Sequence, residues 1–147
     1  MAARVSEPLY TRDILRLASA ISHLGLLDAP DGTADLRSPT CGSRVVVTVK
    51  LDGQGRVVEL GQNVSACAFG QASAALMAAH AIGQSKQQLS SALEAIENWL
   101  RHRVQASPLP APWPGLESLE PARPRTGRHG AILLPFRALL AAIEDAS

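Results

Sequence analysis

Two apolar runs joined by a short glycine-containing turn constrain the fold of this chain more than any other feature. Residues 44–51 (RVVVTVKL) are rich in β-branched side chains that alternate between two faces. The sequence DGQG at 52–55 has turn chemistry, and residues 56–60 (RVVEL) return as a second apolar run. The pattern predicts a β-hairpin, to which we expect residues 61–65 to add a short third strand. The side chains expected on its buried face are Val45, Val47, Val49 and Leu51.

One helix is expected before the hairpin. Thr11 can act as its N-cap, and apolar residues then recur at helical spacing up to a natural stop at Gly25. These apolar residues are Ile14, Leu17, Ala18, Ile21 and Leu24. The next stretch, residues 28–39, is polar and contains proline and glycine, which predicts a loop.

Three further helices are expected after the hairpin. Ser65 can cap an alanine-rich helix that continues to Gly83, and the sequence SKQQ at 85–88 is a capping-box pattern that opens the next helix. The last helix is expected over residues 131–145, with Pro135 in its first turn, where a missing N–H costs little. Core positions expected in the last two helices are Leu89, Leu93, Ile96, Leu100, Leu133, Phe136, Leu140 and Ile143.

The order of helix, hairpin and helices predicts an α+β domain, in which about four helices pack on a small antiparallel sheet of two to three strands. A length of 147 residues fits a single domain over residues 1–147. Six of the ten prolines lie in residues 106–124, which predicts an extended connection held to the domain by Trp113 and Leu116. A disordered linker is the alternative interpretation of this segment.

Composition excludes several classes of function. A net charge of +1 and an aromatic content of 3% provide neither the field nor the stacking surface of a nucleic-acid-binding protein. No apolar run approaches the roughly 20 residues of a membrane span. The first residues, MAARVSEPLY, lack the apolar core of a secretory signal, so we expect a cytoplasmic protein without nucleic-acid or membrane partners.

The residues with the clearest chemistry are two cysteines and one histidine at the boundaries of expected elements. Cys67 lies at the start of a helix, where the positive end of the helix dipole stabilises a thiolate. Cys41 lies in a turn just before a strand, and His129 lies at the start of the last helix. If these boundaries meet in space, two thiolates and an imidazole form a ligand set fit for zinc or iron.

The two cysteines also have a purely structural interpretation. A free cysteine is among the most buried residue types and often behaves as a small apolar side chain. Surface or packing roles are expected for His23, His80 and His102. The arginines near the last helix are expected to form a solvated basic rim, and they are Arg101, Arg103, Arg123, Arg125 and Arg128.

Five short motifs occur along the chain in the order in which one protein family has them. YTRDI at 10–14 matches the start of a first helix, and SPTCG at 38–42 matches a P-x-C-G-D turn. ACAFGQAS at 66–73 matches a G-C-x-x-x-x-A-S turn, WPGLESL at 113–119 matches F-P-x-L-E-x-L, and RHGAILLP at 128–135 falls where a third cysteine is found. The chain therefore resembles, over nearly its whole length, the iron–sulfur cluster assembly scaffolds of the IscU/NifU N-terminal class, closest to their SufU branch.

The resemblance implies a function and its partners. In the family, the cysteines that Cys41 and Cys67 match receive sulfur from a cysteine desulfurase and hold a nascent iron–sulfur cluster or a zinc ion. With His129 as a third ligand, the chain is expected to bind iron, zinc or a labile cluster and to serve iron–sulfur acceptor proteins. It is not expected to be an enzyme, because no nucleophile–base–acid set is present beyond the thiols.

Two family ligands are replaced in this chain. The family's aspartate after C-G is Ser43 here, and its third cysteine is Gly130. A neutral serine is a poor ligand and glycine is none, whereas structural zinc has four protein ligands and a cluster is normally held by four. A missing ligand would come from water, from the second copy in a homodimer, or from a partner protein. The L-P-P-V-K segment by which IscU proteins meet their chaperone is also replaced, by RPRTG at 123–127.

Three functions remain open at this point. The first is a scaffold that binds metal or a cluster through Cys41, Cys67 and His129. The second is a sulfur acceptor in which Cys67 or Cys41 takes a persulfide from a desulfurase without holding a cluster. The third is a metal-free paralogue that acts as a binding module.

Overall fold

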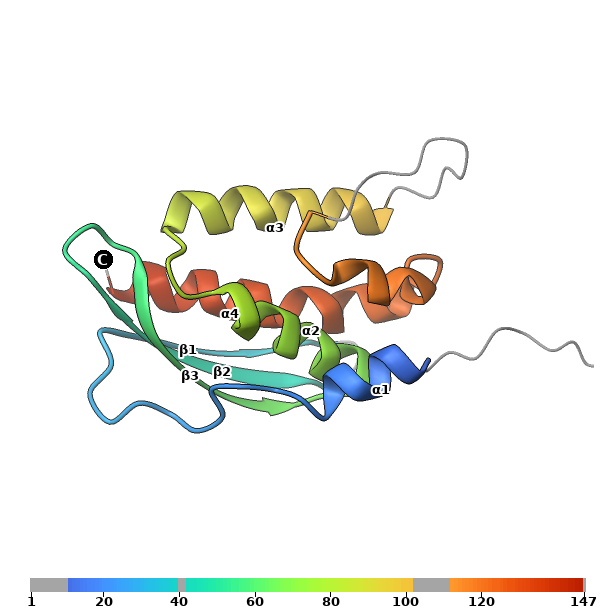
Figure 1. The fold of residues 1–147 in the computed structure, drawn as a ribbon, viewed down its shortest axis with the longest axis horizontal. Helices are drawn as coiled ribbons and strands as arrows, with labels where there is room; N and C mark the ends of the chain where they lie inside the picture. The colour runs from blue at the N-terminus through green and yellow to red at the C-terminus, as the bar shows by residue number, and fades with distance from the viewer. Residues whose placement is uncertain (1–10, 40–41, 102–111, 147) are drawn as a thin grey trace, which may run out of the picture.

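A three-stranded antiparallel sheet forms one side of the molecule, and the helices pack on the other (Figure 1). The computed structural model describes residues 11–39, 42–101 and 112–146. The strands, in the order in which they pair, are β1 (Gly32–Arg37), β2 (Arg44–Leu51) and β3 (Val57–Ser65). The α-helices are α1 (Arg12–Ala18), α2 (Ala68–His80), α3 (Lys86–Arg101) and α4 (His129–Ala146), and the 3₁₀ helices are η1 (Leu116–Ala122) and η2 (Thr126–Arg128).

The helices are arranged in two layers above the sheet. α4 packs along β1 and β2, α2 contacts β3, and α3 contacts α4 on the side away from the sheet (Figure 1). The buried face of β2 consists of Val45, Val47 and Val49, as the alternation predicts, and α2 adds the fully buried Phe69 and Met77. The predicted α+β class with a small antiparallel sheet is confirmed. Among the described residues, no helix combines the length and the apolarity needed to cross a bilayer.

The first strand of the sheet lies where we expected a loop. The prediction of a loop over 28–39 is wrong for residues 32–37, because β1 pairs with β2 in register from Gly32 opposite Val49 to Arg37 opposite Arg44. The strand is short and mostly polar, and its place depends on close packing: a Cβ on Gly32 would overlap the backbone oxygen of Ala142 in α4. Residues 61–65 are not a separate strand either, since they continue β3.

The first helix begins as predicted but ends early. Thr11 caps it, with its Oγ1 accepting the Ile14 N–H at 3.2 Å. The helix ends at Ala18 rather than at Gly25, because the chain then turns to run beside β3. Gly25 N–H donates to the Gln62 carbonyl at 2.9 Å, and a Cβ on Gly61 would overlap the Gly25 carbonyl oxygen.

The bounds of the later helices also differ from the sequence prediction. α2 has Cys67, not Ser65, as its N-cap, and it ends at His80 instead of continuing to Gly83. α4 begins at His129 rather than at residue 131, so Pro135 lies in its second turn and not in its first. The start of α4 is therefore continuous with η2, which ends at the preceding residue.

The proline-rich segment is attached to the domain by its apolar side chains. Trp113 and Leu116 are buried as predicted, and the Trp113 indole N–H donates to the Leu76 carbonyl at 2.8 Å. The Trp113 ring also meets Phe136 edge-on, with 5.0 Å between ring centroids. The expected extended connection is wrong for its second half, where η1 forms, and residues 106–111 lie outside the described residues.

The capping box of α3 is confirmed and yields a stability prediction. Ser85 Oγ accepts the Gln88 N–H at 3.2 Å, and Gln88 Oε1 accepts the Ser85 N–H at 3.0 Å. Ser85→Ala should lower the free energy of unfolding by about 1 kcal/mol, since an N-cap hydroxyl contributes that much. Urea denaturation measures the change. Ser90→Ala, at an exposed position of the same helix, is the control, and an equal loss in both variants would contradict the capping role.

Candidate functional site

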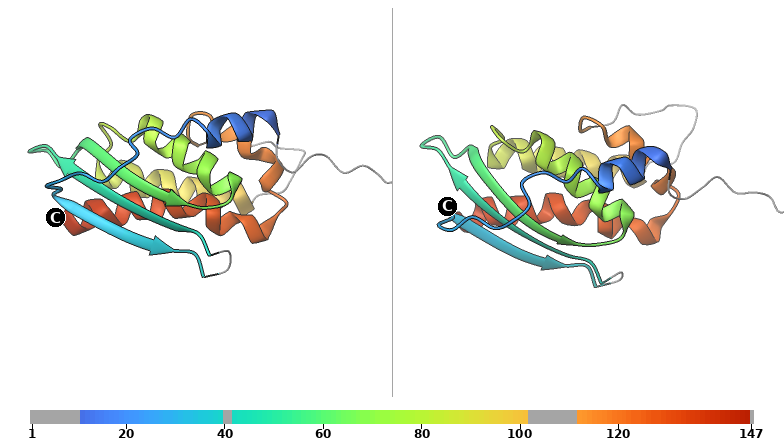
Figure 2. Two further views of the ribbon diagram at one scale, coloured as in Figure 1. Left: turned by 90° about the horizontal axis from the view of Figure 1, so that it is seen from below. Right: turned by 60° about the horizontal axis from the view of Figure 1, so that its bottom comes forward.

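The end of the sheet brings together segments that are distant in the sequence. β2 begins at Arg44, which pairs with Ser65, the last residue of β3. Ser43 therefore lies one residue before Arg44, and Cys67 lies two residues after Ser65. The end of β1 and the first turns of α2 and α4 lie at the same end of the molecule, away from the C-terminus (Figure 2).

Small residues let the first turns of α2 and α4 approach closely. A Cβ on Gly70 would lie 3.4 Å from the carbonyl oxygen of Ala131 and 3.6 Å from its Cβ. One turn later, the buried Ser73 hydroxyl donates a hydrogen bond to the Ile132 carbonyl. Cys67, three residues before Gly70, thus lies at the end of the molecule where α4 begins.

Cys67 lies at the start of α2 as a partly exposed residue. It is a free, half-buried cysteine in extended conformation (φ −68°, ψ 173°), and its side chain makes no capping hydrogen bond. The thiol therefore contributes no cap to the helix, although the side chain packs partly against the hydrophobic core. Its proposed partner Cys41 lies outside the described residues.

His129 is the first residue of α4, and the orientation of its ring is defined by one hydrogen bond. Its Nε2 lies 2.8 Å from the Arg123 carbonyl oxygen. A carbonyl can only accept, so Nε2 carries the proton in this contact and Nδ1 of the neutral ring keeps its lone pair. Metal-binding histidines commonly donate their other ring N–H in this way.

The two positions at which the resemblance leads us to expect further ligands, Ser43 and Gly130, occupy different environments. Ser43 is only 2% exposed, and its carbonyl accepts the Ser38 N–H at 2.8 Å. Gly130 is the second residue of α4 and lines a hollow of about 300 Å³. The other residues around this hollow are Leu36, Arg37, Ser38, Pro39, Leu134 and Arg137. The segment that leads to Cys41 and the start of α4 thus face each other across open space.

One ion pair joins two strands of the sheet near the site. The Arg44 guanidinium hydrogen-bonds both carboxylate oxygens of Asp35, at 2.9 and 2.6 Å, and ties β1 to β2 at the site end of the sheet. This hydrogen bonding holds the pKa of Asp35 below its ordinary value and raises that of Arg44. Both groups are exposed, so the pair contributes little to stability.

One part of the basic rim is not solvated. The side chain of Arg123 is only 11% exposed, and its guanidinium lies 4.6 Å above the centre of the Trp99 ring. The expectation of a solvated role is therefore wrong for this arginine. No periodic pattern predicts its burial, because the contact joins α3 to a segment that follows it by some twenty residues.

His23 and His80 lie away from the start of α4. His23 is exposed and has a positive φ of 59°. Its carbonyl accepts the Gln62 N–H at 2.9 Å. His80, at the end of α2, meets the Trp113 ring edge-on. In the part of the chain that the structure describes, which leaves out Cys41 and His102, no three His, Cys, Asp or Glu residues are grouped as metal ligands would be.

Comparison with known proteins identifies the family. Residues 9–110 match the family described as the NifU-like N terminal domain. The chain is 33% identical to the N-terminal part of a nitrogen-fixing NifU-like protein from Brucella abortus, with 94% of each chain covered and a TM-score of 0.83. No curated protein matches the chain.

Two further solved structures share the fold at lower identity. One is described as a candidate iron–sulfur cluster assembly scaffold protein of the SUF system from thermophilic Fervidobacterium islandicum AW-1, and it is 20% identical over 92% of this chain and 96% of that one, with a TM-score of 0.76. The other is a hypothetical protein, 22% identical over 92% and 97% of the two chains, with a TM-score of 0.71. The matched family model and the coverage and identity of the Brucella abortus protein together show that the chain belongs to the NifU-like N-terminal domain family.

Proposed function

We propose that this chain is a scaffold that binds iron, zinc or a labile iron–sulfur cluster through Cys41, Cys67 and His129. A cysteine desulfurase would supply the sulfur, and iron–sulfur acceptor proteins would take the product. The observation that best supports this is the close packing of Gly70 on Ala131, because it brings the helix starts that carry Cys67 and His129 to one end of the molecule. We further propose that residues 1–147 form one domain that works in the cytoplasm.

Three protein ligands suit a cargo that must leave again. Structural zinc sites are closed by four protein ligands, whereas sites with three keep a position open for exchange. Two thiolates and one imidazole form a borderline-soft set that accepts zinc or iron. With Ser43 buried and Gly130 lacking a side chain, the fourth position would be filled by water, by the second copy in a homodimer or by a partner protein.

Sulfur would reach the scaffold by exchange at a persulfide. The Cys67 thiolate attacks the terminal sulfur of the desulfurase persulfide, a new S–S bond forms on Cys67, and the desulfurase cysteine leaves as a thiolate. No external oxidant is needed, because the bond that breaks is replaced by one of the same kind. The Cys67 thiol is compatible with this step, because the residue is only half-buried and its side chain makes no capping hydrogen bond. A sulfur acceptor that never holds a cluster is therefore the second candidate function.

Anaerobic purification separates the candidates. A scaffold is expected to carry zinc or iron in an amount close to one ion per chain, and to develop visible absorption after incubation with iron and sulfide. A sulfur acceptor would stay colourless but gain the mass of one sulfur atom when incubated with a cysteine desulfurase and cysteine. A chain that shows neither change would contradict both proposals and leave the metal-free binding module.

A further inference from the structure

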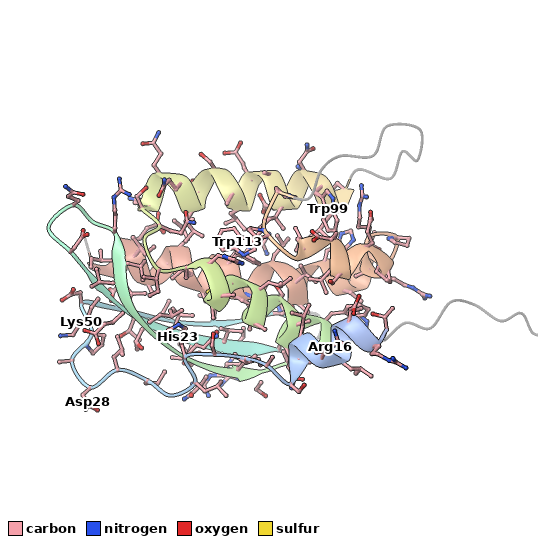
Figure 3. The ribbon with its side chains drawn as sticks, viewed as in Figure 1. Arg16, His23, Asp28, Lys50, Trp99 and Trp113 are labelled. Carbon is pink, nitrogen blue, oxygen red and sulfur yellow. The ribbon has the colours of Figure 1, made fainter. Side chains whose placement is uncertain are left out.

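The residue whose carbonyl oxygen contacts His129 is a nearly buried arginine, Arg123. The Arg123 side chain is 11% exposed and is enclosed between the end of α3, where Figure 3 shows Trp99, and the residues of η1. Its Nε donates to the Trp99 carbonyl at 3.0 Å, and its Nη1 donates to both carboxylate oxygens of Glu120, at 2.7 and 2.9 Å. The guanidinium carbon also lies over the Trp99 ring, 4.6 Å from its centre. A charge removed from water to this extent is tolerated only because its donors have partners.

These contacts immobilise the backbone of Arg123 as well as its side chain. Arg123 is the C-cap of η1, and its N–H donates to the Glu120 carbonyl at 3.0 Å. Both ends of the residue are thus anchored, one to α3 and the other to η1. Its carbonyl oxygen, which is left between these anchors, accepts the hydrogen bond from His129 Nε2 at 2.8 Å.

From this arrangement we infer that Arg123 is a positioning residue for His129: its anchored carbonyl keeps the proton of the neutral imidazole on Nε2, so that Nδ1 is the nitrogen offered to metal or cluster. The inference rests on the proposed function, in which His129 is a ligand. A mobile carbonyl at residue 123 would let the ring turn and would let the proton move to Nδ1, where it blocks coordination. Outer groups that orient a ligating histidine typically contribute 10- to 100-fold in metal affinity.

The first measurement needs no metal. In the metal-free protein at a pH where imidazoles are neutral, long-range ¹H–¹⁵N NMR spectra report which ring nitrogen of His129 carries the proton. The wild type should show the Nε2–H form, whereas Arg123→Gln should show a mixture of the two forms. Arg123→Lys keeps the charge but not the stacked, forked contacts, so it should restore the wild-type spectrum only in part. An unchanged Nε2–H form in Arg123→Gln would overturn the inference.

The second measurement is a double-mutant cycle on cobalt or zinc affinity. Arg123→Gln should weaken binding by about 10- to 100-fold, and it should have no further effect in a His129→Ala background. Lys86→Gln is the matched control, since Lys86 also pairs with a glutamate, Glu144 at 3.9 Å, and this pair lies at the opposite end of α4 from His129. An equal loss with and without His129 would show that Arg123 acts through the fold and would overturn the inference.

A second variant and the metal-free spectra cover the cases in which Arg123→Gln does not fold or His129 is not a ligand. Glu120→Gln weakens the anchor but keeps the arginine, and it should give a smaller tautomer shift if Arg123→Gln fails to fold. If His129→Ala leaves metal affinity unchanged, the proposed ligand set fails, but the tautomer spectra of the metal-free protein still decide whether Arg123 positions the ring.

Discussion

Cys67→Ser should lower zinc affinity by about 100-fold or more without weakening the fold. Structural zinc with four ligands has an apparent binding free energy of about 10–16 kcal/mol, or roughly 3 kcal/mol for each ligand, which corresponds to about 100-fold. The fold should tolerate the change because the thiol makes no capping bond, is only partly buried against the core, and is close to a serine hydroxyl in size. A serine at an N-cap can accept a backbone N–H of the first turn, so the metal-free variant should be as stable as the wild type or up to about 1 kcal/mol more stable.

Zinc competition titration and urea denaturation of the metal-free protein measure these two effects separately. Ala66→Ser is the matched control, because it adds a hydroxyl to the neighbouring half-buried residue and keeps the thiol. If Cys67→Ser unfolds the protein and the wild type takes up no metal, then Cys67 is a packing residue and the metal-free binding module becomes the better interpretation.

Gly130→Cys should raise zinc affinity by a similar factor, about 100-fold, because it adds a third thiolate at the family ligand position. Gly130 lies inside α4 and is not among the glycines with positive φ, so a side chain there meets no backbone strain, and the neighbouring hollow offers room. Replacing a helical glycine should also stabilise the fold by a few tenths of a kcal/mol. The gain in affinity should increase with pH, since thiols must lose a proton to bind metal.

The other departure from the family is a poorer place for the same experiment. Ser43 is 2% exposed, and Ser43→Asp would put a carboxylate where loss of water opposes its charge.

Gly127→Cys is the control for Gly130→Cys: it adds a thiol three residues earlier, where a Cβ has no neighbour within 4 Å. Equal affinity gains in both variants would indicate adventitious binding by any added thiol. No gain in zinc affinity in Gly130→Cys would show that the start of α4 is not part of the metal site.

Local patterns in the sequence were sufficient for some elements and insufficient for others. The hairpin and the Ser85 capping box depend on neighbours in the chain, and both are confirmed. The strand β1 and the early end of α1 depend on distant packing. Gly32 can lie in a strand because it packs closely against α4. The segment from α1 to Gly25 is not helical because the Gly25 N–H donates to the Gln62 carbonyl of β3.

The candidate site shows the same division. The position of Cys67 at a helix start follows from the alanine-rich run and the motif around it, and α2 begins there. The burial of Arg123 could not be predicted, because the stretch RPRTG resembles a solvated basic loop unless its contact with Trp99 is known. Single-sequence patterns report faces of helices and strands, but not which side chain of an irregular segment turns inward.

X-ray absorption at the zinc edge, on anaerobically purified wild-type protein, would show the ligand set itself. Coordination by Cys41, Cys67 and His129 requires two sulfur atoms at about 2.3 Å and one nitrogen at about 2.0–2.1 Å, with a light atom in the fourth position. The same spectrum of Cys67→Ser should lose one sulfur. A wild-type spectrum with only oxygen and nitrogen neighbours, or a protein that retains no zinc even after incubation with zinc and desalting, would rule out the thiolate zinc site.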